Sequence, residues 1–226
     1  MPLRAAVFDF DGVIVDSEPL HFGALRDALR PEGVEITEDE YLGIYLAFDD
    51  REAIRRALEH HGERPGRETV ARVEARKVAR FAERIPGIPV FPGARDLVLS
   101  LAEQVPIAIA SGARHDEIEA ILGGLGLLEA FGAIVGAEDA ERTKPDPAPY
   151  LEAARRLAGR TPGLAPADCV AFEDSMAGID SALGAGMKVV GVAHSYPAER
   201  LQAAHRVVDS LVGVDATSLR GLFESP

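Results

Sequence analysis

Short runs of apolar residues recur along the chain, and each has the length of a β-strand. These runs are almost continuously apolar, which is typical of parallel strands covered on both faces. Segments with a helical pattern separate them, and this alternation predicts an α/β fold with a doubly wound parallel sheet. The predicted strands cover residues 5–8, 105–110, 133–136, 169–172 and 188–192, with a further edge strand at 206–209, and the predicted helices cover 93–104, 114–123, 147–159 and 175–185.

Residues 17–88 break this alternation, because they contain only helix signals punctuated by glycine and proline. We therefore expect two domains. Residues 1–16 and 89–226 are predicted to form the α/β core domain, and residues 17–88 a small helical domain inserted after the first strand. Ligands of open α/β sheets bind beyond the carboxyl ends of the strands. An insertion that leaves this edge is expected to cover a ligand there as a cap.

The composition narrows the choice of partners and location. A length of 226 residues suffices for one core and a small inserted domain, and 47% hydrophobic residues exclude wholesale disorder. The net charge of −13 argues against nucleic acid, but a few local cations can still hold a small phosphate compound. No run approaches the roughly 18 apolar residues that span a bilayer, and no signal peptide is apparent. Cys169 is the single cysteine, so we expect no disulfide and a cytoplasmic protein.

Two acidic residues stand at the end of the first predicted strand. Side chains two apart in an extended chain point the same way, so Asp9 and Asp11 are expected to project together while Phe10 turns into the core. Two carboxylates this close need a cation or a shared proton. The pair suits Mg²⁺, or one Asp as a nucleophile for phosphorus beside an acid/base. For this segment alone, the alternative is an ordinary cap of a strand-to-loop turn.

Polar residues follow three further predicted strands, and each has an ordinary structural alternative. Ser111 and Gly112 precede a helix, where a hydroxyl and free N–H groups can hold a phosphate or simply form a cap or turn. Lys144, held extended by the proline after it, can neutralise carboxylates or remain a solvated surface charge. Glu173 and Asp174 can complete a metal site, or Asp174 or the next serine can cap the following helix. Because carboxyl ends of parallel strands share one edge, we expect these groups in one crevice.

In order and spacing, these motifs resemble those of the haloacid dehalogenase (HAD) superfamily. The chain is similar over essentially its whole length to the β-phosphoglucomutase-like group, in which a helical cap follows the first motif. The resemblance rests on residues 8–13 (FDFDGV), Ser111, Lys144, residues 173–179 (EDSMAGI) and residues 184–187 (GAGM).

The resemblance implies a catalytic role for the core motifs. Asp9 would attack phosphorus and become an aspartyl phosphate. Asp11 would protonate the leaving oxygen and then activate the attacking water. Ser111 and Lys144 would hold phosphoryl oxygens, with Gly112 among the substrate-binding residues, and positioning with fixed charge would supply most of the acceleration.

The resemblance also implies Mg²⁺ as the cofactor. The metal would be held by the carboxylates of Asp9 and Asp174 and by the backbone carbonyl of Asp11, with Glu173 nearby. These four residues are the predicted metal site.

The predicted cap supplies four candidate substrate-binding residues. Lys77 lies on the apolar stripe of the helix predicted at 67–85, where it can extend past its neighbours to solvent or face the crevice. Lys77 and Arg51 occupy places where the family is expected to carry phosphate-contacting cap residues. His21 matches the family pattern but can equally be a packed helix residue. Glu18 belongs to a stretch that is similar to the phosphatase members.

We therefore predict a Mg²⁺-dependent phosphatase that acts on a small phosphorylated metabolite, such as a sugar phosphate. The alternative is a β-phosphoglucomutase-like isomerase that returns the same phosphoryl group to a sugar. A bisphosphate intermediate would need a second phosphate site, which Arg51 and Lys77 could form. Residues 17–21 and the longer spacing from Gly43 to Arg51 favour the phosphatase. A non-catalytic binding protein is a third hypothesis, weakened because every expected catalytic residue is present.

Overall fold

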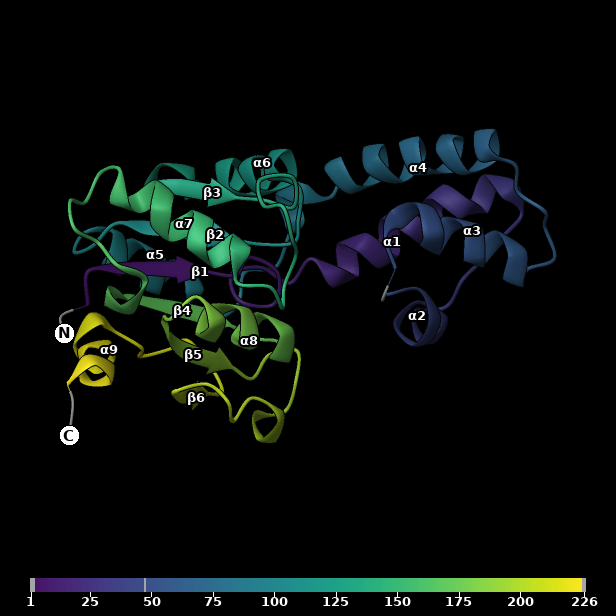
Figure 1. The fold of residues 1–226 in the computed structure, drawn as a ribbon. Helices are drawn as coiled ribbons and strands as arrows, with labels where there is room; N and C mark the ends of the chain where they lie inside the picture. Colours follow the sequence, from purple (N-terminus) through teal and green to yellow (C-terminus); the bar gives the residue numbers. More distant parts are fainter. Residues whose placement is uncertain (1–2, 47, 225–226) are drawn as a thin grey trace. The chain divides into compact units, whose positions relative to one another are not determined.

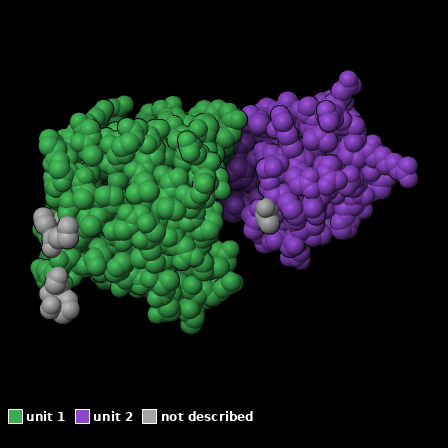
Figure 2. All heavy atoms as spheres, in the orientation of Figure 1, with its two compact units in different colours: residues 1–16, 89–226 green, residues 17–88 purple. Residues whose placement is uncertain are grey.

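The computed structural model describes residues 3–46 and 48–224. Ala47, within the stretch from Gly43 to Arg51 discussed above, lies outside the described residues. The chain divides into two compact units (Figure 2). The first unit comprises the chain up to Asp16 and from Pro89 onward, and the second comprises Ser17–Ile88.

The first unit is built on a parallel sheet with the strand order β3-β2-β1-β4-β5-β6 (Figure 1). The predicted doubly wound α/β fold with an inserted helical unit is thereby confirmed. The second strand begins later than predicted, because Val105 still donates to Leu101 O at the end of the preceding helix and Pro106 has no N–H. The strands are β1 (Ala5–Phe8), β2 (Ile107–Ala110), β3 (Ala133–Val135), β4 (Cys169–Glu173), β5 (Lys188–Val192) and β6 (Arg206–Val208).

Helices cover both faces of this sheet. Every residue of β1, β2 and β4 is buried, which explains their continuous apolar character. Apolar side chains of α7 (Ala148–Ala158) and α8 (Met176–Gly184) pack with those strands into one cluster, in front of the sheet in Figure 1, while α5 (Ala94–Ala102) lies behind it. The other described α-helices of this unit are α6 (His115–Leu125) and α9 (Ala216–Arg220).

The strand order reverses beside β1. The chain places β2 and β3 on one side of β1, and β4, β5 and β6 on the other. In open α/β sheets the crevice beyond the strand ends at such a reversal is where ligands bind. The carboxyl ends of β1, β2 and β4 therefore mark the position of the candidate site.

Helices are the only regular secondary structure among the described residues of the second unit. Thr37 forms a capping box with Glu40 at the start of α2, which continues as a π-helix over Tyr41–Tyr45, and Asp49 caps α3. A separate apolar cluster, which includes Leu29, Ile54 and Val73, is the core of this unit. Its described α-helices are α1 (Glu18–Leu29), α2 (Glu38–Glu40), α3 (Asp50–His60) and α4 (Arg67–Ala82). Among the residues described, none of the helices is both long and apolar enough to cross a membrane.

The two connections to the second unit leave the first unit as hydrogen-bonded neighbours. Val15 forms an antiparallel bridge with Val90. Asp16 N donates to Pro89 O at 2.9 Å, and Phe91 N donates to Ile14 O at 3.0 Å. The outgoing and returning chains are thus fixed side by side at the edge of the first unit.

Candidate active site

Three acidic side chains converge at the carboxyl ends of β1 and β4. The strands pair with Phe8 opposite Phe172, so the residues that follow, Asp9 and Glu173, lie next to each other. Asp174 completes the group, and one carboxylate oxygen from each residue lies within 4.8 Å of the others. All three residues are buried. Like charges this close are unfavourable without a cation.

Lys144 supplies positive charge to this group. Its Nζ lies 2.9 Å from Asp9 Oδ1 and 2.6 Å from Glu173 Oε1. The side chain is 13% exposed, so the alternative of a solvated surface lysine is wrong. Asp146 accepts a hydrogen bond from Ala148 N at 3.0 Å and thereby fixes the loop between Lys144 and α7.

Burial and charge shift the pKa values of these groups. Burial, followed by the charge of Glu173, raises the pKa of Asp9 well above its usual value, although Lys144 opposes the shift. Burial also raises the pKa of Asp174 to about 6. Burial alone would lower the pKa of Lys144, but the charges of Asp9 and Glu173 outweigh it and raise that pKa. The site carries more negative charge than one ammonium compensates, so its oxygen ligands suit a hard divalent cation.

Asp11 is not part of this acidic group of described residues. β1 ends at Phe8, and the chain bends, with Asp9 Oδ1 accepting a hydrogen bond from Phe10 N at 2.7 Å. The alternation of side chains in an extended strand therefore does not continue to Asp11, whose backbone instead forms a bridge with Val15. Phe10 is fully buried, as predicted.

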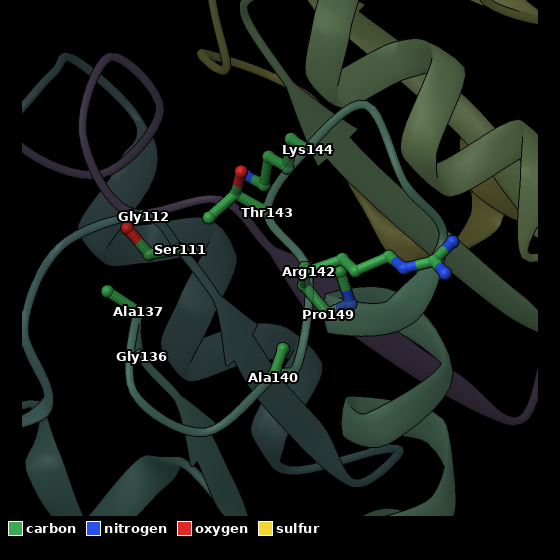
Figure 3. Close-up of a pocket in the computed structure, with 9 residues that line it drawn as sticks. All are labelled: Ser111, Gly112, Gly136, Ala137, Ala140, Arg142, Thr143, Lys144 and Pro149. Atoms are coloured by element: carbon green, nitrogen blue, oxygen red, sulfur yellow. The ribbon is translucent and has the colours of Figure 1, made fainter.

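Ser111 lies in the loop that follows β2. Its Oγ accepts a hydrogen bond from Ala113 N at 3.0 Å. Because α6 begins only at His115, Ser111 is not the N-cap of that helix. Ser111, Gly112 and Lys144 line one cavity of about 170 Å³, and Figure 3 shows Ser111 and Lys144 on separate loops around it. A hydroxyl and an ammonium thus border the same space.

Two hydroxyl groups of the site were not anticipated from the sequence. Tyr150 donates a hydrogen bond to Glu173 Oε1 at 2.7 Å, and Ser195 is hydrogen-bonded to Asp174. Tyr150 stands in a helix with an apolar stripe, where an aromatic residue indicates core packing. Ser195 follows β5 without any motif around it. The sequence carried no signal for either contact.

The lack of a side chain at Gly178 leaves room for the Glu173 carboxylate. A Cβ at position 178 would overlap the carboxyl group of Glu173, whereas Gly123, on the exposed face of α6, has nothing within 4 Å of such an atom. We expect Gly178→Ala to lower the free energy of unfolding by about 1–3 kcal/mol in urea titrations. Gly123→Ala, the matched control, should raise it by about 0.5–1 kcal/mol. Equal effects of the two changes would contradict this account of Gly178.

Lys77 of the second unit is buried and has two polar partners. Its Nζ lies 2.8 Å from the Asp50 carboxylate and 2.9 Å from His21 Nδ1. The His21 ring stacks on Phe81 with ring centroids 4.4 Å apart. Lys77 therefore does not extend past its neighbours to solvent, and His21 is a packed residue that also makes a polar contact.

The other two residues predicted in the helical unit are also paired within it. Arg51 Nε lies 2.8 Å from a carboxylate oxygen of Glu74, although three quarters of the Arg51 side chain is exposed. Glu18 accepts a hydrogen bond from the Tyr41 hydroxyl at 2.7 Å. Substrate contacts of His21, Arg51, Lys77 and Glu18 stay predictions.

Comparison with known proteins gives consistent matches. A family model described as haloacid dehalogenase-like hydrolase matches residues 3–186. Hexitol phosphatase B of Escherichia coli (strain K12) is 33% identical over 97% of this chain and 94% of its own length. A phosphatase of phosphorylated carbohydrates from Thermotoga maritima is 31% identical over 85% of this chain and 87% of its own length. The crystal structure of a β-phosphoglucomutase from Clostridium difficile superposes with a TM-score of 0.76 at 25% identity, covering 99% of this chain and 97% of the other.

The fold and the acidic site at its strand ends define an α/β enzyme with a helical insertion after the first strand. The chain belongs to the haloacid dehalogenase-like hydrolase family. The predicted resemblance and the prediction of a hydrolytic enzyme are thereby confirmed.

Proposed function

We propose that this chain is a Mg²⁺-dependent phosphatase that hydrolyses a small phosphorylated sugar or sugar alcohol through an aspartyl phosphate. The observation that carries the proposal is the position of Lys144, whose ammonium lies against Asp9 beside two further buried carboxylates. A carboxylate held this way can act as a nucleophile toward phosphorus while the lysine balances the charge of the phosphoryl group.

In the proposed reaction, Asp9 attacks phosphorus and displaces the sugar oxygen. Asp11 donates a proton to that oxygen and then takes a proton from the water that hydrolyses the aspartyl phosphate. Ser111, Gly112 and Lys144 bind the phosphoryl oxygens in the cavity they share. Free phosphate and the dephosphorylated alcohol are the products.

The proposed metal site consists of Asp9, Asp174 and the backbone carbonyl of Asp11, with Glu173 beside it. The buried oxygens of the acidic group fit Mg²⁺, because they are hard ligands whose mutual repulsion a divalent cation would relieve. When bound, Mg²⁺ would withdraw charge from the phosphoryl oxygens and orient the nucleophile.

The substrate class rests on relatives. Hexitol phosphatase B and the Thermotoga maritima enzyme are named for phosphorylated sugars or sugar alcohols, and both match most of this chain. We propose that Ser17–Ile88 acts as the cap, with Glu18, His21, Arg51 and Lys77 contacting the substrate.

A phosphoglucomutase-like isomerase is the second candidate, and the similarity to a β-phosphoglucomutase structure favours it. A mutase handles a bisphosphate and needs cations for the second phosphate. Lys77 is paired with Asp50 and Arg51 with Glu74 in the helical unit. These pairings do not separate the two candidates, because Lys144 is paired with carboxylates as well. The phosphatase is the better supported proposal, because relatives named as phosphatases match most of this chain.

Phosphate release from a panel of sugar and sugar-alcohol phosphates, measured with and without Mg²⁺, tests the proposal. We expect selective release that EDTA abolishes and Mg²⁺ restores. No release from any ester, combined with conversion of β-glucose 1-phosphate in the presence of a bisphosphate primer, would replace the phosphatase by the mutase.

Binding of Mg²⁺ is expected to raise the Tm of the chain, and this effect can be measured without catalytic turnover. At 100 times its Kd, Mg²⁺ should stabilise the wild-type chain by about 2.7 kcal/mol and raise its Tm by roughly 5–10 °C. Asp174→Asn should lose most of this shift, because it removes a proposed ligand. Asp180→Asn, on the exposed side of α8, is the matched control and should keep it. The same Mg²⁺ shift in both variants would exclude Asp174 as a ligand.

A further inference from the structure

The Glu173 carboxylate is fully enclosed and has a defined donor for each oxygen. Oε1 accepts hydrogen bonds from Lys144 Nζ at 2.6 Å and from the Tyr150 hydroxyl at 2.7 Å. Oε2 accepts a hydrogen bond from Ser175 Oγ at 3.1 Å. Ser175 N also donates to Oε2, at 3.4 Å. Two donors on each oxygen fix the rotation of this carboxylate about its terminal bond.

Tyr150 contacts both partners of the ion pair between Lys144 and Glu173. Its hydroxyl bonds to Glu173, and its ring centroid lies 5.3 Å from Lys144 Nζ. The side chain is completely buried in the apolar cluster between the sheet and α7, so the ring has no freedom to move away. The packed ring therefore holds the hydroxyl in a fixed position, where it is a hydrogen-bond donor to the acidic group.

The position of the Lys144 ammonium depends on the oxygens that surround it. An ammonium is a compact charge on a flexible stem, without the fixed fork of a guanidinium. Lys144 Nζ is shared between Asp9 Oδ1 and Glu173 Oε1, so a rotation of the Glu173 carboxylate would move the ammonium relative to Asp9. The Tyr150 hydroxyl opposes this rotation.

We infer that Tyr150 is a positioning residue, whose hydroxyl holds Glu173 so that the Lys144 ammonium stays aimed at Asp9 and at the phosphoryl group. The inference rests on the proposed function for the role of Lys144, and it assigns to Tyr150 no contact with substrate. Loss of the hydroxyl should therefore weaken the binding of phosphate by Lys144 and leave the metal site intact.

Tyr150→Phe tests this inference, because it removes one oxygen and keeps the packed ring. We expect a reduction of about 10-fold in kcat/KM, since the lost hydrogen bond is made to a charged group. Binding of inorganic phosphate, titrated calorimetrically in the presence of Mg²⁺, should weaken several-fold. The Mg²⁺ affinity of the metal-free chain should stay within about twofold of the wild-type value.

Tyr45→Phe is the matched control. Tyr45 is also buried, but it lies in the helical unit, and its hydroxyl has no hydrogen-bond partner among the described residues. This variant should match the wild type in activity, phosphate binding and Mg²⁺ affinity. Melting curves of both variants show whether the fold is retained.

The outcomes separate the possible roles of Tyr150. Weaker phosphate binding and slower turnover at unchanged Mg²⁺ affinity support the inference. A 10- to 100-fold loss of Mg²⁺ affinity, which is typical of a residue that orients a metal ligand, would overturn it, as would a lower Tm with unchanged phosphate binding. If the wild type hydrolysed no ester, the proposed function would fail, while the phosphate and Mg²⁺ titrations would still decide the role of Tyr150.

Discussion

Asp9→Asn is expected to lower phosphate release by about 10⁴-fold or more with every ester that the wild-type chain hydrolyses. The amide has no negative oxygen with which to attack phosphorus. Glu173 also contacts Lys144, but from the end of β4, so it does not replace the Asp9 carboxylate at the end of β1. The substitution also removes one of the three carboxylates that lie close together in the acidic group. Burial and Glu173 already raise the pKa of Asp9, so the metal-free variant should be at least as stable as the wild type.

Single-turnover and steady-state phosphate release, together with urea unfolding, measure both parts of this prediction. Asp215→Asn is the matched control. Asp215 caps α9 through Ser218 N, and Asn is an equally good cap, so activity and stability should be unchanged. Retention of even one hundredth of the wild-type rate in Asp9→Asn would show that another group is the nucleophile.

Lys144→Met is expected to lower kcat/KM by about 10²-fold or more, because it removes the charge that faces Asp9 and borders the cavity lined by Ser111 and Gly112. In contrast to Asp9→Asn, it should also destabilise the metal-free chain. The carboxylates of Asp9 and Glu173 would remain buried without their cation, at a cost of about 3 kcal/mol. Activity and stability should therefore fall together.

The same assays, run with and without Mg²⁺, check this prediction. Lys188→Met removes a lysine from the start of β5, outside the proposed site, and should leave the rate unchanged. Part of the stability of Lys144→Met should return with Mg²⁺, since the metal would supply the missing positive charge. An active Lys144→Met variant would remove the basis of the proposed chemistry.

The strands of the sheet were predictable because burial on both faces makes them continuously apolar. β1 and β5 occur at the predicted residues. The start of β2 was less predictable, since Val105 is apolar but belongs to the end of the preceding turn. Strand order depends on contacts between distant segments, which periodicity along the chain does not encode.

The candidate site was predictable where polar residues follow apolar strands directly. Asp9 directly follows β1 and Glu173 ends β4, so the two come together because parallel strand ends meet at one edge of the sheet. Lys144 reaches them from the long loop between β3 and α7, so its position was less predictable. The absence of Asp11 from this group of described residues was not predictable, because the argument from strand alternation holds only while the chain stays extended. Tyr150 was missed because its hydroxyl is polar while its helix position is that of a core residue.

The environment of Lys77 shows a further limit of the sequence pattern. Its place on an apolar stripe left two alternatives, extension past its neighbours to solvent or an orientation toward the crevice, and the side chain is in fact buried. The pattern does not identify which groups compensate the charge. The Asp50 carboxylate of α3 does so, and His21 Nδ1 of α1 lies within hydrogen-bond distance of the same ammonium.

The paired connections at Val15 and Val90 make the helical unit an exchangeable module. Its two ends start from neighbouring, hydrogen-bonded positions on the sheet unit, so a tight turn between Asp16 and Pro89 could close the chain without moving a strand. For the same reason, any domain whose own termini lie close together can be grafted at this point. The chemistry of the strand ends and the choice of substrate can therefore diversify independently in evolution, or be recombined by design.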